Sequence, residues 1–460
     1  MQSDAHASTL YNSAVRRFVL ALTFLVIYAP AVAEANGRFP KAQVIETIPG
    51  DDGRTVFLRA TFGILVSHDG GKTWRWMCEQ AYGSQSTWDP PFAVTRDARV
   101  WIGMPNGMRV TKDGCDVTGV AELDGETVVD FSDVPGEAGL YAATSTPNRP
   151  SFVWRQKSTG AWEKRGALPD LHVDTLDAAP SNAGRVYVTA VPNGTRKSRL
   201  FVSDDGGGTL TEVHTKLPVD GRVFLAAIDP KAQGRLLVRI LHDAGSELAV
   251  STDGGATFRV VLHMHGAMFG FARSEDGKTY WAGSGDPKEG IWRSVDRGEH
   301  WESMAKSGVF CLHADGPRLF ACSNPYVPNG YAVAVSLDEG ASFTPLATFD
   351  SIEGPISCDA GAGVACEAAW PAARSLLATG GGEGRTVPVA SSQPSAGDAG
   401  ADAGTVTAGP QARACGCAVP GNRTGGSPVG AVVIAGVAWM ERRRRKLDRM
   451  RPTRLESDSV

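Results

Sequence analysis

The chain has 460 residues, of which 50 are acidic and 46 basic, so its formal net charge is −4. This slight acidic excess gives no electrostatic reason to expect nucleic acid as a partner, and we predict none. The 54 glycines, together with many short runs that contain Val, Ile, Phe or Trp, indicate an all-β protein that is rich in turns.

The first 33 residues have the layout of a secretory signal peptide. Arg16 and Arg17 precede a short apolar run at 18–28, and Ala31-Val32-Ala33 fits the small-x-small pattern of a cleavage site. The apolar run is too short to cross a bilayer comfortably. We therefore expect residues 1–33 to be removed and the remaining chain to be exported.

An eight-residue pattern recurs between residues 67 and 343. Five copies follow Ser-x-Asp-x-Gly-x-x-aromatic, with Leu210 replacing the aromatic residue in one, and weaker copies at 111–118 and 155–162 fill the gaps. Successive copies start 42 to 48 residues apart, a spacing typical of propeller blades. Two strands joined by a loop precede each copy, one strand follows it, and a further strand opens each unit. The sequence thus predicts an all-β, seven-bladed β-propeller of four-stranded blades within residues 34–370.

The recurring pattern resembles the Asp-box (BNR) repeat of β-propellers over roughly residues 40–350. The resemblance implies a structural role, in which the Asp accepts hydrogen bonds within its own turn, the Gly allows positive φ and the aromatic packs between sheets. We expect no catalysis or metal binding there, because the regular spacing puts each Asp on a separate blade. The residues assigned to these turns are Ser67, Asp69, Gly71, Trp74, Asp113, Trp162, Ser203, Asp205, Gly207, Ser251, Asp253, Gly255, Phe258, Ser294, Asp296, Gly298, Trp301, Ser336, Asp338, Gly340 and Phe343.

The loops between the second and third strands of the units repeat a Pro-Asn motif. Pro-Asn-Gly is favourable turn chemistry and by itself accounts for the motif. These loops should also rim the face opposite the Ser-x-Asp-x-Gly turns, where loops around a central channel would meet a ligand. The candidate ligand-face residues are Asn106, Asn148, Arg149, Asn193, Arg196, Lys197 and Asn329.

Enzymatic and metal-binding alternatives have weaker support. Propellers with this repeat include sialidases, and that resemblance would imply three arginines, a Tyr–Glu pair, an acidic Asp and an R-I-P signature. Arg38-Phe39-Pro40 is one residue away from that signature, and the eight tyrosines lie mostly in strand or loop patterns. His263 and His265 would share one face of a strand, but no third metal ligand is identifiable. We therefore assign no catalytic residue, metal or other cofactor, with a sialidase-like glycoside hydrolase as the alternative.

Export makes the cysteines candidates for disulfides. One pair flanks a hairpin, a second occupies related points of successive repeats, and a third encloses a short loop. These criteria predict the pairs Cys311–Cys322, Cys78–Cys115 and Cys358–Cys366.

The C-terminal part changes composition abruptly. Residues 371–414 are rich in Ala, Gly, Ser and Thr and nearly free of large apolar residues, which predicts a disordered linker. The segment 415–446 then contains two cysteines, an apolar stretch at 429–440 and a basic cluster. A basic and polar tail follows at 447–460.

The order of cysteine, apolar stretch and basic cluster resembles the myxobacterial sorting signal MYXO-CTERM. The resemblance implies cleavage by a dedicated intramembrane protease, lipid attachment at Cys415 or Cys417, and display on the outer cell surface. A plain transmembrane anchor is the alternative for this apolar stretch.

Together these features predict an exported, surface-anchored propeller on a flexible stalk. We expect a non-enzymatic role, the binding of an extracellular protein or glycan. The binding role has two alternatives: the sialidase-like hydrolase, and a purely structural envelope component that has no ligand.

Overall fold

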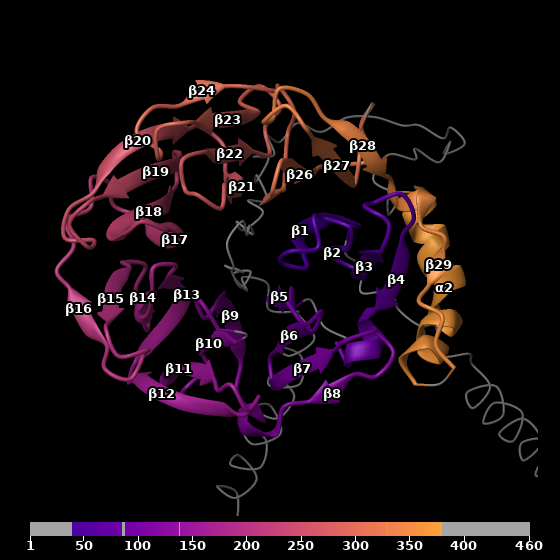
Figure 1. Ribbon diagram of the computed structural model, residues 1–460, viewed down its shortest axis with the longest axis horizontal. Helices are drawn as coiled ribbons and strands as arrows, with labels where there is room; N and C mark the ends of the chain where they lie inside the picture. The colour runs from indigo at the N-terminus through magenta and orange to yellow at the C-terminus, as the bar shows by residue number, and fades with distance from the viewer. Residues whose placement is uncertain (1–38, 85–87, 138, 329, 360, 380–460) are drawn as a thin grey trace, which may run out of the picture.

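The protein forms a ring of seven β-sheets in the computed structural model, which describes residues 39–84, 88–137, 139–328, 330–359 and 361–379 (Figure 1). Six sheets have four strands, and the first has a fifth, short strand added at its outer edge. The predicted seven-bladed, four-stranded architecture is confirmed. One α-helix, α2 (Ala362–Thr379), lies outside the ring beside β4 and β29.

Each blade is built from four strands that are consecutive in the sequence. Blade 1 contains β1 (Ala42–Thr47), β2 (Val56–Ala60), β3 (Gly63–Ser67) and β4 (Arg75–Cys78); blade 2 contains β5 (Phe92–Val94), β6 (Val100–Met104), β7 (Gly107–Thr111) and β8 (Thr118–Gly119); blade 3 contains β9 (Val128–Asp133), β10 (Leu140–Thr144), β11 (Ser151–Gln156) and β12 (Trp162–Leu168). Blade 4 contains β13 (Leu171–Ala179), β14 (Asn182–Pro192), β15 (Arg199–Ser203) and β16 (Thr211–Val213); blade 5 contains β17 (Arg222–Asp229), β18 (Ala232–His242), β19 (Gly245–Ser251) and β20 (Arg259–Met264). Blade 6 contains β21 (Met268–Arg273), β22 (Tyr280–Ser284), β23 (Ile291–Ser294) and β24 (Glu302–Ser303); blade 7 contains β25 (Cys311–Asp315), β26 (Arg318–Cys322), β27 (Val333–Ser336) and β28 (Thr344–Ala347). Short 3-10 turns lie at η1 (Glu79–Tyr82), η2 (Ala121–Leu123) and η3 (Phe349–Ser351), and the added strand is β29 (Gly354–Pro355).

The first strand of each blade lies nearest the axis of the ring (Figure 1). Apolar residues of neighbouring blades pack together between the sheets, so both faces of the inner strands are buried. Buried polar side chains also join one blade to the next. The Leu176 amide donates to Asp130 Oδ2 at 2.7 Å, and the Leu225 amide donates to Thr175 Oγ1 at 3.0 Å. These bonds satisfy polar groups that would otherwise be costly to bury.

Each Ser-x-Asp-x-Gly turn connects the third strand of its blade to the fourth, and the turns share a common set of hydrogen bonds. In the first, the Ser67 hydroxyl donates to Asp69 Oδ1 at 2.8 Å and accepts from the Gly71 amide at 2.8 Å. Asp69 Oδ1 also accepts from the Thr73 amide at 3.0 Å. Gly71 has φ +91°, which a side chain would strain, and the Trp74 indole donates to its carbonyl at 2.9 Å. Contacts of this kind support a structural role for the turns.

The same Ser–Asp–Gly bonding recurs at four other turns, whose serines are Ser203, Ser251, Ser294 and Ser336. In the weaker copies, Asp113 accepts from the amides of Cys115 and Asp116, whereas the copy at 155–162 has Lys157 at its third position. That turn is closed by the backbone instead, and Trp162 begins β12 as a buried residue. The turn of blade 3 therefore keeps its place and its aromatic residue without a carboxylate.

The carboxylates of these turns predict a loss of stability in acid. A hydrogen bond from the Thr73 amide is the main factor that lowers the pKa of Asp69 to about 2, and bonds from Thr257 lower that of Asp253 to about 2. A carboxyl whose pKa is lower in the folded state stabilises the fold above its unfolded pKa near 3.8, and loses that contribution as the pH falls through about 2. We expect urea unfolding midpoints to fall between pH 4 and pH 2. Replacing both residues by Asn should flatten this decline, and an unchanged slope would contradict the assignment.

The ring is closed by a strap that the chain forms after blade 7. In this strap, residues 352–379, β29 pairs in parallel with the outer strand β4 of blade 1, and α2 packs beside β4 (Figure 1). Two disulfides, Cys78–Cys366 and Cys115–Cys358, join the strap to blades 1 and 2. The predicted Cys311–Cys322 pair is confirmed within blade 7. The predicted pairs Cys78–Cys115 and Cys358–Cys366 are wrong, because the strap runs along the outer edge of blade 1 and brings together cysteines that are distant in the sequence.

The helix α2 continues beyond residue 370, where the sequence suggested that a linker begins. Trp370 packs against Trp76 with ring centroids 5.5 Å apart, Leu377 is buried, and the Tyr326 hydroxyl donates to the Leu377 carbonyl at 3.0 Å. These apolar contacts stabilise the helix despite Pro371 in its interior. The α-helix of the strap therefore extends over residues 371–379, the beginning of the segment for which the composition predicts a linker.

Several expectations fall outside the described residues. These are the signal peptide at 1–33, the linker from 380 onward, Cys415, Cys417, the apolar stretch at 429–440 and the tail. Within the described ranges, no helix has both the length and the apolar character needed to cross a membrane.

Candidate functional site

The candidate ligand-face residues lie together on one face of the ring. Because consecutive strands of a blade are antiparallel, the loops between strands two and three and the connections between blades share one face, and the Ser-x-Asp-x-Gly turns lie on the other. We call the face that carries the loops between strands two and three the 2–3 face. Asn106 lies in the β6–β7 loop, Asn148 and Arg149 in the β10–β11 loop, and residues 193–197 in the β14–β15 loop, and all six candidates are exposed. Asn329 lies outside the described residues.

Arg149 is only partly available to a ligand, because it contacts a buried carboxylate. Its guanidinium lies 3.4 Å from Glu126 Oε1 and donates to the Gly125 carbonyl at 3.0 Å. Lys164 Nζ lies 3.1 Å from the same oxygen, and the Glu126 side chain is 3% exposed. Removing one partner from a buried carboxylate is costly, so this group holds the β10–β11 loop in place.

Arg196 and Lys197 occupy a loop that is fixed to the inner wall of the ring. Ser198, the next residue, accepts a hydrogen bond from the Val223 amide at 2.8 Å. Beside it, Arg222 binds the buried Asp174 through two hydrogen bonds, one from Nε at 3.0 Å. The exposed Arg196 and Lys197 are thus carried on a loop that is hydrogen-bonded to β17 through Ser198, next to the Arg222–Asp174 ion pair.

A Ser–His contact lies next to this ion pair. Ser145 Oγ is 2.7 Å from His172 Nδ1, and burial lowers the pKa of His172, which favours a neutral imidazole. Ser145 is buried and also accepts from the Val173 amide at 3.3 Å and from Ser151 Oγ at 3.0 Å. A nucleophile must be reachable by substrate, so this serine joins blades 3 and 4 and is not a candidate nucleophile.

Aromatic rings and a lysine line the same end of the inner wall between blades 6, 7 and 1. Lys41 Nζ lies 4.0 Å from the centre of the Phe310 ring and 4.7 Å from that of Phe269. Burial lowers the pKa of Lys41. The sequence does not indicate this cation–π group, because its members come from the beginnings of three blades and are far apart along the chain.

Two tyrosines make hydrogen bonds between neighbouring blades. Tyr141 and Tyr187 occupy the same position in β10 and β14, and their hydroxyls donate to the carbonyls of Ala183 and Gln233 in the next blade, at 2.7 and 3.0 Å. Burial raises the pKa of both hydroxyls. Neither contact is the Tyr–Glu arrangement that a sialidase would require.

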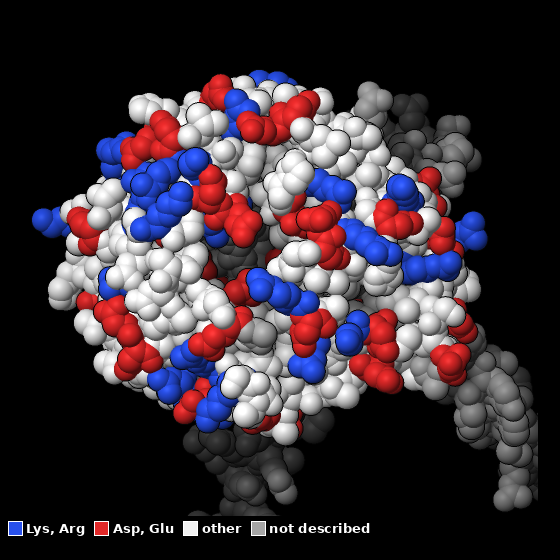
Figure 2. All heavy atoms as spheres, in the orientation of Figure 1, with Lys and Arg blue, Asp and Glu red and all other residues white. Residues whose placement is uncertain are grey.

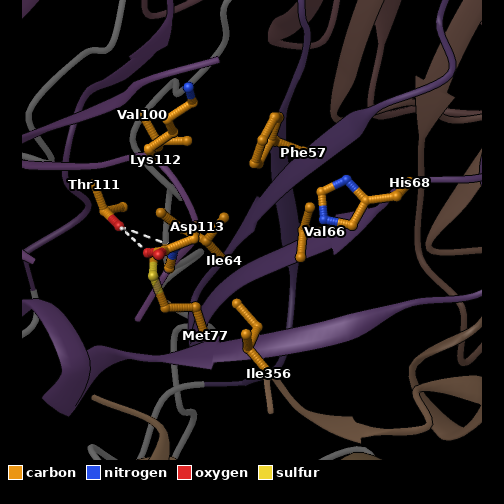
Figure 3. Close-up of a pocket in the computed structure, with 11 residues that line it drawn as sticks. Phe57, Ile64, Val66, His68, Met77, Val100, Thr111, Lys112, Asp113 and Ile356 are labelled. Carbon is orange, nitrogen blue, oxygen red and sulfur yellow. Dashed lines mark hydrogen bonds between the residues drawn. The ribbon is translucent and has the colours of Figure 1, made fainter. Parts of the chain in front are cut away.

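A small cavity lies between blades 1 and 2 on the side of the Ser-x-Asp-x-Gly turns (Figure 3). Its volume is about 30 Å³, and its lining includes Phe57, Ile64, Met77 and Val100, with Ile356 of the strap. Ligand sites are typically larger by about tenfold or more. Asp113 at its edge is held by Thr111 (Figure 3), and we interpret the cavity as imperfect packing.

On the face that Figure 2 shows, acidic and basic side chains are interspersed around the ring. In the part of the chain that the structure describes, no group of three or more His, Cys, Asp and Glu side chains is placed to hold a metal ion. His263 and His265 do lie side by side at the 2–3 face, with ring centroids 4.8 Å apart.

The fold and its loop-lined face define a seven-bladed β-propeller with three disulfides, which fits an exported protein. The chain matches no protein-family model and no curated protein.

Similar solved structures include a GH74 xyloglucanase from Xanthomonas campestris, with 12% identity over 68% of this chain and 58% of that one and a TM-score of 0.37. YCF48 from Cyanidioschyzon merolae has 16% identity over 61% and 92% of the two chains, with a TM-score of 0.42. The extracellular domain of a two-component system from B. thetaiotaomicron has 13% identity over 64% of this chain and 38% of that one, with a TM-score of 0.46. This chain spans 58% of the xyloglucanase and 50% of a second, ancestral GH74 enzyme. These likenesses carry no argument about function.

Proposed function

We propose that the protein is an exported, cell-surface propeller that binds an extracellular protein or glycan at its 2–3 face without catalysing a reaction on it. The observation that carries this proposal is the β14–β15 loop, which presents the exposed Asn193, Arg196 and Lys197 and is hydrogen-bonded to β17 at Ser198, beside the Arg222–Asp174 pair. A loop that is already held in place suits recognition, because less loop entropy is lost on binding.

The contacts and pKa shifts of acidic side chains favour a binding role over a hydrolytic one. A glycoside hydrolase uses two carboxyl groups, one of them an acid with a raised pKa. On the 2–3 face Glu126 and Asp174 each bind cations, and backbone hydrogen bonds hold the pKa of Glu289 below its usual value although burial opposes this. Asp315, whose pKa is raised by burial, ends β25 on the opposite face. The sialidase-like hydrolase is therefore the less supported alternative.

The proposal is tested by glycan-array and pull-down screens with the mature protein. Reversing two charges on the 2–3 face with R196E/K197E should weaken capture of the identified ligand about tenfold or more, which corresponds to about 1.4 kcal/mol. The matched control K72E/K112E makes the same charge change on the opposite face and should bind normally. Equal losses in both variants, or release of sugar from a captured glycan, would contradict a binding site at this face.

The surface anchor is part of the proposal and is tested separately by intact-mass analysis of the protein from the cell surface. The mature chain is expected to begin near Glu34 or Asn36, to end near Cys417 and to carry lipid. A mature mass that includes Arg442–Arg445 would overturn cleavage of the sorting signal and favour a plain transmembrane anchor.

A further inference from the structure

Two histidine rings meet at the end of β20 on the 2–3 face. His263 belongs to β20, and His265 follows directly after the strand. Their ring centroids are 4.8 Å apart at an interplanar angle of 78°, and their side chains are 45% and 87% exposed. Both imidazoles can therefore be reached from solvent.

Each of these histidines has a carboxylate on the same ring nitrogen. His263 Nδ1 lies 2.7 Å from Glu247 Oε1, its cross-strand partner on β19, and His265 Nδ1 lies 3.3 Å from Glu289 Oε1 in the β22–β23 loop. A carboxylate can only accept a hydrogen bond, so both Nδ1 atoms donate. In the neutral imidazoles the lone pair is then on Nε2, which is the form that binds metals.

The two carboxylates are themselves held in position. The Glu247 side chain is only 9% exposed, and its Oε1 also lies 3.4 Å from His242 Nε2 on β18. Glu289 accepts hydrogen bonds from the amides of His265 at 2.5 Å and Gly266 at 3.0 Å. These contacts come from blade 5 and blade 6, so the fold places one carboxylate behind each ring.

We propose that His263 and His265 bind one divalent transition-metal ion through their Nε2 atoms, with Glu247 and Glu289 as positioning residues. Metal–imidazole bonds are about 2.0–2.1 Å long, so rings this close are within reach of a single ion. Two protein ligands leave coordination positions open to water or to an external donor. Imidazole sites favour Cu²⁺ among the divalent first-row metals. This proposal stands independently of the ligand proposed above.

The test is a calorimetric titration of the full chain with Cu²⁺ alone near neutral pH, followed by electron paramagnetic resonance of the complex. One equivalent of Cu²⁺ with two nitrogen ligands is expected. H263A and H265A should each weaken binding at least tenfold and leave at most one of these nitrogens. E247Q and E289Q should weaken it about 10–100-fold while keeping both nitrogens, because they act through the histidines.

His300 provides a matched control. Its Nδ1 lies 2.6 Å from Asp296 Oδ2 and its side chain is 90% exposed, but it lies on the opposite face, in a Ser-x-Asp-x-Gly turn. H300A should leave Cu²⁺ affinity unchanged. The proposal is overturned if no stoichiometric binding occurs, if H263A and H265A bind as the parent does, or if H300A loses as much affinity. Thermal unfolding of each variant without metal distinguishes lost ligands from lost structure.

Discussion

A variant that lacks both strap disulfides, C78A/C115A/C358A/C366A, is expected to lose about 2–5 kcal/mol of unfolding free energy. Each of these bonds closes most of the ring into a covalent loop, with 288 residues separating one pair and 243 the other. Without them the strap is joined to blades 1 and 2 by non-covalent contacts, which include the pairing of β29 with β4, the packing of α2 and an ion pair between Arg75 and Glu353. The measurement is the guanidinium unfolding midpoint of the oxidised parent and the variant, followed by circular dichroism.

Removing one disulfide at a time distinguishes the effect of ring closure from a general effect of losing cysteines. Removing only Cys115–Cys358 should cost clearly less than removing both, because Cys78–Cys366 still closes the large loop. Removing Cys311–Cys322, which spans 11 residues between strands that are already paired, should also cost less. An equal or larger loss from the Cys311–Cys322 variant would show that closure of the ring is not the source of the stability.

Replacing Asp174 with Ala is expected to cost about 3–5 kcal/mol, because it leaves a largely buried guanidinium without its carboxylate. Asp174 is fully buried and Arg222 is 24% exposed, and two hydrogen bonds join them. Since Arg222 begins β17 and Asp174 lies in β13, the change also weakens the junction of blades 4 and 5. Equilibrium unfolding measures the effect.

The control for this change is Asp204→Ala. Asp204 lies 2.7 Å from Arg185, but its side chain is 67% exposed, and pairs of this kind contribute about 1 kcal/mol or less. In D174A/R222M the unpaired cation is gone, and part of the loss should be recovered. If D174A were no less stable than D204A, the Asp174–Arg222 pair would not be a main contributor to the junction of blades 4 and 5.

The blades could be predicted because their signals are local. A Ser-x-Asp-x-Gly turn is bonded within itself, as at Ser67 and Asp69, so each copy can be recognised without knowing its neighbours. The regular interval between copies then gives the number of blades. Strand alternation likewise assigns loops to faces, and the exposed positions of Arg196 and Lys197 agree with that reasoning.

Contacts between blades could not be predicted in the same way. Cys78 pairs with Cys366 only because the strap returns past blade 7, a path that the spacing of cysteines does not encode. The partners of His265 and Arg222 likewise come from neighbouring blades. One usable signal was present: Asp174 is an acidic residue in the otherwise buried strand β13, and such a residue requires a partner.

The disulfide strap has a consequence for the proposed location of the protein, where proteases outside the cell would reach it. Because Cys78 and Cys366 are covalently joined, a single cut of the backbone anywhere between them leaves both fragments in one molecule. The two fragments would still be held in the ring by the packing between blades. Such a nicked protein would migrate as one species until it is reduced, and an extracellular cleavage would not by itself release either half.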